Sequence, residues 1–133
     1  MQQKNINKRF KNTAPAPSTE KASLELKSLS KGQQYEQLVA QFFIEKGWSL
    51  MCKNKKFFGV ETDLIIKKNQ IYLLIEVKSL RREFLLEKII SPKQKKRLKK
   101  VYSMLANEFE GHWYLLLATV NNKQKINFFD LLN

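Results

Sequence analysis

The carboxylates Glu61, Asp63 and Glu76 lie together with Lys78 in the apolar stretch ETDLIIKKNQIYLLIEVKS, residues 61–79. Asp63 precedes Glu76 by thirteen residues, with a polar segment at 68–70 about midway, and Lys78 follows Glu76 by two. Two carboxylates brought within a few ångströms repel each other, unless one is protonated or a cation lies between them. Oxygen ligands select a hard ion, Mg²⁺ or Mn²⁺, which is shared with substrate phosphates. The pattern therefore indicates metal-dependent phosphodiester hydrolysis, with Lys78 holding or helping to deprotonate the attacking water.

A β-hairpin is the element that would bring these residues together. The segments TDLIIK and IYLLIEVK flank the polar turn at 68–70, which is the pattern of two strands and their connection. Because side chains alternate between the faces of a strand, Glu76 and Lys78 share one face, and Asp63 can lie alongside them. Glu61 shares the face of Asp63 if the first strand extends back that far. The rival interpretation is a structural ion pair at the ends of the strands.

A helix before the hairpin carries a fourth carboxylate. It is predicted to begin around Ser30 and to end at Gly47, which is well placed as a C-terminal stop. Glu36 stands three and seven residues before Val39 and Phe43, which belong to the apolar stripe of this helix. Its carboxylate is therefore expected to point toward the core or its edge.

The remaining elements complete an α-β-β-β-α-β-β order. Ser91 and Pro92 predict the start of a second helix that reaches 109, with Gln94 in capping-box spacing from Ser91. The other predicted segments are a strand at 48–52, a basic loop at 53–59, a linker at 79–90 and two final strands at 113–120 and 126–132. We expect one α/β domain at 29–133, with a mixed central sheet flanked by helices, after a disordered basic tail at 1–28.

The charge of the chain favours a polyanionic partner. Its 25 Lys and Arg residues exceed its 12 Asp and Glu residues, which leaves a formal charge of +13, and nucleic acid is the usual partner of such a field. An anionic membrane surface and ribosomal RNA are alternatives that charge alone leaves open. No apolar run approaches the ~20 residues of a membrane-spanning helix. Cys52 is the only cysteine, so an intrachain disulfide and a cysteine-based zinc site are excluded.

The span 32–110 resembles the PD-(D/E)xK, or restriction-endonuclease-like, nuclease superfamily, whose common core is αβββαβ. Within it the chain is similar to the YraN-type endonuclease-related family. The resemblance is carried by GQQYEQLVAQFFIEKGW, ETDLI, LLIEVKS and SPKQKKRLKKVYSML. It implies a nuclease-like site more firmly than it implies a particular substrate.

The resemblance assigns expected roles to individual residues. Asp63 and Glu76 would hold the metal, Lys78 would be the catalytic lysine, and Glu36 would complete the acidic pocket. Glu61 matches an acid typical of the family and gives possible support to the site. The expected nucleic-acid contacts are the basic start of the second helix and an arginine after the lysine motif, together with further basic residues of that helix: Arg81, Arg82, Lys93, Gln94, Lys96, Arg97 and Lys100.

The sequence thus predicts a cytoplasmic Mg²⁺- or Mn²⁺-dependent endonuclease that acts on DNA, including branched or junction DNA, and that associates with the nucleoid if the chain is bacterial. DNA is preferred to RNA as the expected partner, and a homodimer is compatible with the resemblance. Two alternatives stay open. One is a nucleic-acid-binding module that retains the fold without turnover. The other is a basic protein of the ribosome or membrane surface, in which the carboxylates are structural.

Overall fold

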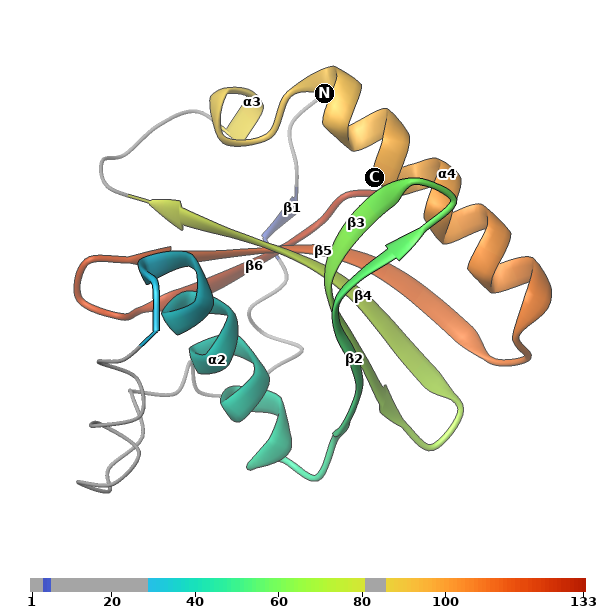
Figure 1. Cartoon of the computed structure of the whole chain (residues 1–133), viewed down its shortest axis with the longest axis horizontal. Coiled ribbons are helices and arrows are strands. Elements are labelled where there is room, and N and C mark those ends of the chain that lie inside the picture. Colours follow the sequence, from blue (N-terminus) through green and yellow to red (C-terminus); the bar gives the residue numbers. More distant parts are fainter. Residues whose placement is uncertain (1–3, 6–28, 81–85) are drawn as a thin grey trace.

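The computed structural model describes residues 4–5, 29–80 and 86–133. In chain order its elements are β1 (Lys4–Asn5), α2 (Lys31–Ile44), β2 (Ser49–Phe57), β3 (Val60–Lys68), β4 (Ile71–Leu80), α3 (Leu86–Ile89), α4 (Pro92–Glu108), β5 (His112–Asn121) and β6 (Ile126–Asp130). The strands form one sheet in the order β1-β6-β5-β4-β3-β2 (Figure 1). Only β4 and β5 pair in parallel, and every other neighbouring pair is antiparallel. The predicted mixed α/β architecture, compatible with a restriction-endonuclease-like core, is confirmed.

The helix starts follow from local capping. Ser30 accepts a hydrogen bond from the Gln33 backbone, and the Gln33 side chain accepts one from the Ser30 backbone, which is a complete capping box. Ser91 caps α4 by accepting a hydrogen bond from Gln94 N–H, with Pro92 at the first helical position. Both predicted helix starts are therefore confirmed. α4 lies in the connection between the parallel strands β4 and β5, where such a pair requires a crossover.

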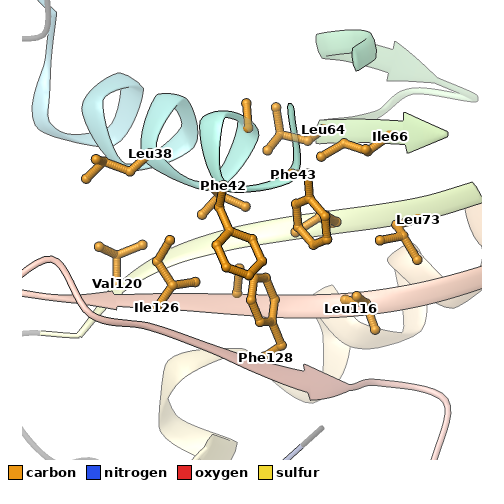
Figure 2. Packing of buried hydrophobic residues seen from close by; sticks show 14 residues of the cluster. Leu38, Phe42, Phe43, Leu64, Ile66, Leu73, Leu116, Val120, Ile126 and Phe128 are labelled. Atoms are coloured by element: carbon orange, nitrogen blue, oxygen red, sulfur yellow. The ribbon is translucent and has the colours of Figure 1, made fainter. Parts of the chain in front are cut away.

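The sheet is covered on both faces, as the apolar hairpin strands predicted. Leu73 and Ile75 of β4 join a core beneath α2, in which Phe42, Phe43 and Phe128 pack together (Figure 2). The intervening residue of β4 points to the other face and joins a second core, beneath α4. That second core comprises Ile65, Leu74, Ile90, Leu98, Val101, Leu105, Trp113, Leu115, Leu117 and Leu131. Strand alternation thus places Glu76 and Lys78 on the α4 side.

Two connections differ from the sequence prediction. The predicted basic loop at 53–59 is wrong, because β2 continues to Phe57 as the edge strand and pairs with β3. A two-residue turn suffices, since Phe58 and Gly59 both have positive φ, as tight hairpin turns of type I′ require. The lysines of this segment suit an edge strand, because charged side chains there oppose pairing with the edge of another molecule. The predicted linker at 79–90 is also partly wrong, because β4 extends to Leu80 and α3 follows. Residues 81–85 lie outside the described residues.

The region predicted as a disordered tail contains β1, which pairs Lys4 with Asp130 and Asn5 with Phe129 of β6. The rest of residues 1–28 lies outside the described part of the chain, so the boundary between tail and domain stays a prediction.

Gly111, between α4 and β5, is required by a close approach. Its φ is +138°, and an added Cβ would lie 2.7 Å from the Gln70 carbonyl oxygen and 2.9 Å from the Tyr72 ring. Gly111→Ala should therefore lower the free energy of unfolding by about 1–3 kcal/mol, measured by urea denaturation. Gly32→Ala is the matched control, since no atom lies within 4 Å of its added Cβ. Equal stability of these two variants would contradict the steric argument.

Candidate active site

The pairing between β3 and β4 ends next to the carboxylates that the hairpin carries. The last registered pair of the two strands is Leu64 with Ile75. Beyond it Asp63 Oδ2 accepts a hydrogen bond of 2.8 Å from Val77 N–H. The Asp63 carboxylate thus lies between the two strands where they separate, here called the hairpin fork. It accepts from a backbone N–H that would otherwise donate to β3 if the strands continued to pair. This bond fixes Asp63 beside the strand that carries Glu76 and Lys78, as the hairpin predicted.

Glu76 is buried, with only 5% of its surface exposed. Gln94 of α4 donates its side-chain N–H to Glu76 Oε2 at 3.1 Å. Burial raises the pKa of Glu76 to about 9, and the hydrogen bond with Asp63 and the Asp63 charge act in the same direction. The Lys78 charge and the Gln94 hydrogen bond oppose this increase in pKa. At neutral pH the buried Glu76 carboxyl therefore retains its proton when no metal ion is bound.

Lys78 is half-buried, two residues beyond Glu76 on the same face of β4. Its charge stabilises the ionised form of Glu76, as the lowering effect on the Glu76 pKa shows. In the parallel ladder Lys78 pairs with Thr119 of β5. The Thr119 hydroxyl is buried, and within the described residues it has no hydrogen-bond partner. A polar group thus lies beside Lys78 on the neighbouring strand, a feature that no local sequence pattern indicates.

The state of the Thr119 hydroxyl can be tested by unfolding. Thr119→Val removes a buried hydroxyl without a partner, so the free energy of unfolding should rise by about 1 kcal/mol. Thr62→Val is the matched control, because the Thr62 hydroxyl is buried but donates to the Lys55 carbonyl at 2.9 Å. That variant should lose about 1 kcal/mol. Urea denaturation of both variants measures the difference, and a loss of stability in Thr119→Val would show that its hydroxyl is bonded.

Glu36 reaches the same centre from α2. It is 8% exposed, which confirms that its side chain points toward the core edge. Burial raises its pKa, and the Asp63 charge raises it further, whereas a hydrogen bond from Asn54 and the Lys53 charge lower it. Glu36 and Asp63 are therefore electrostatic neighbours although they come from different elements. Glu61 is exposed and has a smaller effect of the same sign on Glu36, which places it at the periphery.

Sequence reasoning missed two residues at this centre. Asn54 of β2 has a φ of +51°, a conformation that asparagine tolerates better than most residues. No sequence pattern indicated this role, because residues 53–59 were predicted as a loop, where asparagine is common. Gln94 was predicted as a nucleic-acid contact, but the structure directs its amide to Glu76. That contact depends on how α4 packs against the sheet, which no local pattern encodes.

Comparison with known families gives one match, which covers most of the described domain. The model of the uncharacterised protein family UPF0102 matches residues 35–131. The chain belongs to the UPF0102 (YraN) family. This family is part of the restriction-endonuclease-like superfamily, so the resemblance stated from the sequence motifs is confirmed. A comparison with curated proteins found no match.

In this UPF0102 chain the site offers two carboxyl groups as metal ligands. Within the described residues no group of three or more His, Cys, Asp or Glu side chains is placed to hold a metal. Asp63 and Glu76 nevertheless fit Mg²⁺, because this ion is commonly held by one or two carboxylates, with waters and substrate phosphates completing its shell. A donor set made of oxygens alone also fits a hard cation.

The outer side of α4 forms a basic groove with a volume of about 590 Å³. Its lining is Lys93, Lys96, Arg97, Lys99, Lys100 and Ser103. Four of the residues predicted to contact nucleic acid therefore share one surface of this UPF0102 chain. Arg81 and Arg82 lie outside the described residues, so their role stays a prediction. None of the described helices is both long and apolar enough to cross a membrane.

Proposed function

We propose that the protein is a Mg²⁺- or Mn²⁺-dependent endonuclease that hydrolyses phosphodiester bonds in DNA, with branched or junction DNA among its substrates. The observation that carries the proposal is the Asp63–Glu76 pair at the open end of a hairpin. The second carboxyl is buried, the first is fixed by Val77 N–H, and Lys78 lies beside them. A buried carboxyl with a strongly raised pKa beside a second carboxyl is typical of a functional site.

Each residue has a distinct task in this proposal. Asp63 and Glu76 would hold the ion, which would supply a bound water of lowered pKa and stabilise charge on the phosphate. Lys78 holds or helps to deprotonate the water, and Gln94 orients the Glu76 carboxyl. Glu36 adds negative charge from α2. Glu61 lies at the periphery and supports the site only through its charge.

DNA would be held by its phosphates. The groove on α4 presents Lys93, Lys96, Arg97 and Lys100 to solvent, beyond the face that carries Gln94. Lysine and arginine contacts to phosphate give affinity and orientation without reading the sequence. Branch geometry rather than base sequence is therefore the expected basis of any selectivity.

One observation favours a second candidate, a nucleic-acid-binding module without turnover. The acidic pair is already satisfied internally, by the Val77 and Gln94 donors and by the proton that the raised pKa of Glu76 retains. Such a pair is stable without an ion. In this case the basic groove would bind nucleic acid while the carboxyls remain structural.

A cleavage assay separates the two functions. Purified protein is incubated with branched, flapped, single-stranded and linear DNA in Mg²⁺, in Mn²⁺ and in EDTA. The nuclease proposal expects cuts in at least one substrate with metal, none in EDTA, and none by Glu76→Ala or Lys78→Ala. Glu108→Gln, an exposed carboxyl at the end of α4, is the control that keeps activity. Absence of cutting, or equal cutting by the variants, would favour the binding module.

A further inference from the structure

A second hollow lies on the α4 side of the sheet, between the β2–β3 hairpin and the C-terminal half of α4. Figure 1 shows this hairpin curling beside α4. The hollow, here called the aromatic groove, has a volume of about 350 Å³. Its lining is Met51, Cys52, Lys55, Phe57, Ile65, Tyr72, Leu105, Phe109 and Trp113. It shares no residue with the carboxylate site or with the basic groove.

The floor of the aromatic groove is a fixed stack of rings. Tyr72 and Trp113 are parallel, with ring centroids 4.3 Å apart and an interplanar angle of 4°. Trp113 Nε1 donates to the Phe109 carbonyl at 3.0 Å, and Tyr102 Oη donates to the Trp113 carbonyl at 3.1 Å. These bonds hold the indole and the end of α4 in place. The groove is therefore preorganised and needs no rearrangement to receive a flat apolar group.

The walls of the groove are apolar and open to solvent. Met51 is 53% exposed and Phe109 is 49% exposed. The Phe109 ring lies 6.3 Å from the Trp113 ring at an angle of 44°, so it borders the stacked pair without covering it completely. Exposed apolar side chains gathered around a concave surface mark a binding site more often than isolated exposed residues do.

The rim of the groove is cationic, and this selects the partner. Lys55 Nζ lies 5.4 Å from the centroid of the Phe57 ring, and Lys67 Nζ lies 5.1 Å from that of Tyr72. Lys55 also lines the groove itself. A second copy of the chain would bring a surface of the same sign toward these lysines. An occupant with a flat apolar body and an anionic backbone complements both features.

We propose that the aromatic groove binds an unpaired nucleobase of a nucleic-acid strand. The rings and Met51 contact the faces of the base, and the lysines at the rim contact the adjoining phosphates. A base inside a duplex is stacked and paired, so it cannot enter the groove without leaving the helix. The groove thus assigns the substrate class as nucleic acid with single-stranded or displaced nucleotides. The inference shares the nucleic-acid partner of the proposed function but does not depend on cleavage.

The groove is placed to act with the carboxylate site. Ile65 of the groove follows Asp63 by two residues on β3, which is about 7 Å along the strand. Gln94 and Phe109 mark opposite ends of α4, about 22 Å apart at helical rise. A strand bound along this side of the sheet would meet the carboxyl pair near one end of α4 and the groove near the other.

Binding in EDTA tests the inference without cleavage. Fluorescence anisotropy compares an oligothymidylate of about 12 nucleotides with an abasic strand of equal length and charge. The native protein should bind the oligothymidylate roughly 5- to 100-fold more tightly, the range of base stacking on aromatic side chains. Phe109→Ala should bring this ratio close to one without changing the Kd for the abasic strand. Met51→Ala, on the opposite wall, should lower the ratio as well.

Two control variants and three contrary outcomes complete the test of base binding in the aromatic groove. Ile44→Ala removes a similarly exposed apolar side chain, 42% exposed on α2, and should leave the ratio unchanged. Equal binding of the two strands by native protein would overturn the inference and leave a phosphate-only contact. Unchanged ratios in both groove variants would overturn it too, as would self-association that depends on Phe109. Glu108→Gln should bind like native protein. Because binding is measured in EDTA and cleavage is measured with metal, a failed nuclease proposal and a failed groove proposal are distinguishable.

Discussion

Replacing Glu76 with glutamine is expected to abolish metal-dependent cleavage while making the metal-free protein more stable at alkaline pH. Cleavage should fall by roughly 10³-fold or more, because the bound ion accounts for several kcal/mol of barrier lowering. Glutamine matches protonated Glu76 in shape. Its N–H can donate to Asp63, and its oxygen can still accept from Gln94 at the position where Glu76 Oε2 accepts at 3.1 Å. The fold should therefore be retained.

The gain in stability follows from the pKa of Glu76, about 9 in the folded protein against an ordinary value of 4.5. Folding takes up a proton wherever the folded pKa is higher than the unfolded pKa. The contribution of Glu76 to stability is therefore complete below about pH 4.5 and is lost progressively as the pH rises to about 9. The slope approaches 1.4 kcal/mol per pH unit inside this window. Glutamine does not titrate, so Glu76→Gln should remove that slope.

Urea denaturation at pH 6 and pH 8 measures the effect, with EDTA present throughout. The difference in unfolding free energy between variant and native protein should be larger at pH 8 than at pH 6. Glu108→Gln, at an exposed position, should follow the native protein at both pH values. A variant that is less stable than native protein at pH 8 would mean that Glu76 is ionised in the fold. A variant that still cleaves at the native rate would remove Glu76 from the mechanism.

Local patterns predicted the parts of the fold that local chemistry determines. The apolar stripe that follows Ser30 and the Ser91-Pro92 start placed both long helices, since each signal involves neighbours in the sequence. Alternation along β4 placed Glu76 and Lys78 on one face, and helical spacing placed Glu36 at the core edge. Each of these predictions depends only on residues within one helix or one strand.

Features that depend on packing between elements were not predictable. β2 was expected to end at 52, because a lysine-rich segment is typical of a loop; its pairing with β3 and the turn at Phe58 extend it to Phe57. The Gln94–Glu76 bond requires the docking of α4 on β4. The fork at Asp63 likewise requires that pairing stop after Leu64 and Ile75. In each case the partner comes from another element, which no single-sequence pattern identifies.

Binding of Mg²⁺ or Mn²⁺ should become tighter as the pH rises, by about tenfold per pH unit between about pH 6 and 8. The ion requires ionised carboxylates, but Glu76 is protonated in the metal-free protein throughout this range because of its burial and its contact with Asp63. Each ion bound must then displace about one proton, and affinity follows the fraction of ionised Glu76. Removing the ion with EDTA should return the proton and lower the melting temperature in proportion to the affinity lost.

Titration calorimetry at one pH in two buffers of different ionisation enthalpy counts the protons released, and repetition across the pH range gives the affinity. Asp63→Ala should lose detectable binding, because one carboxyl alone holds the ion weakly. Glu108→Gln should match the native protein in both affinity and proton release.

Affinity that does not change with pH, or binding without proton release, would show that the ion is held by groups other than the Asp63–Glu76 pair. The buried proton and the metal would then belong to separate sites, and the hairpin fork would lose its proposed role. If native protein releases a proton on binding the ion and Glu76→Gln does not, the released proton comes from Glu76. The ion would then bind at the buried carboxyl that is protonated in the metal-free protein.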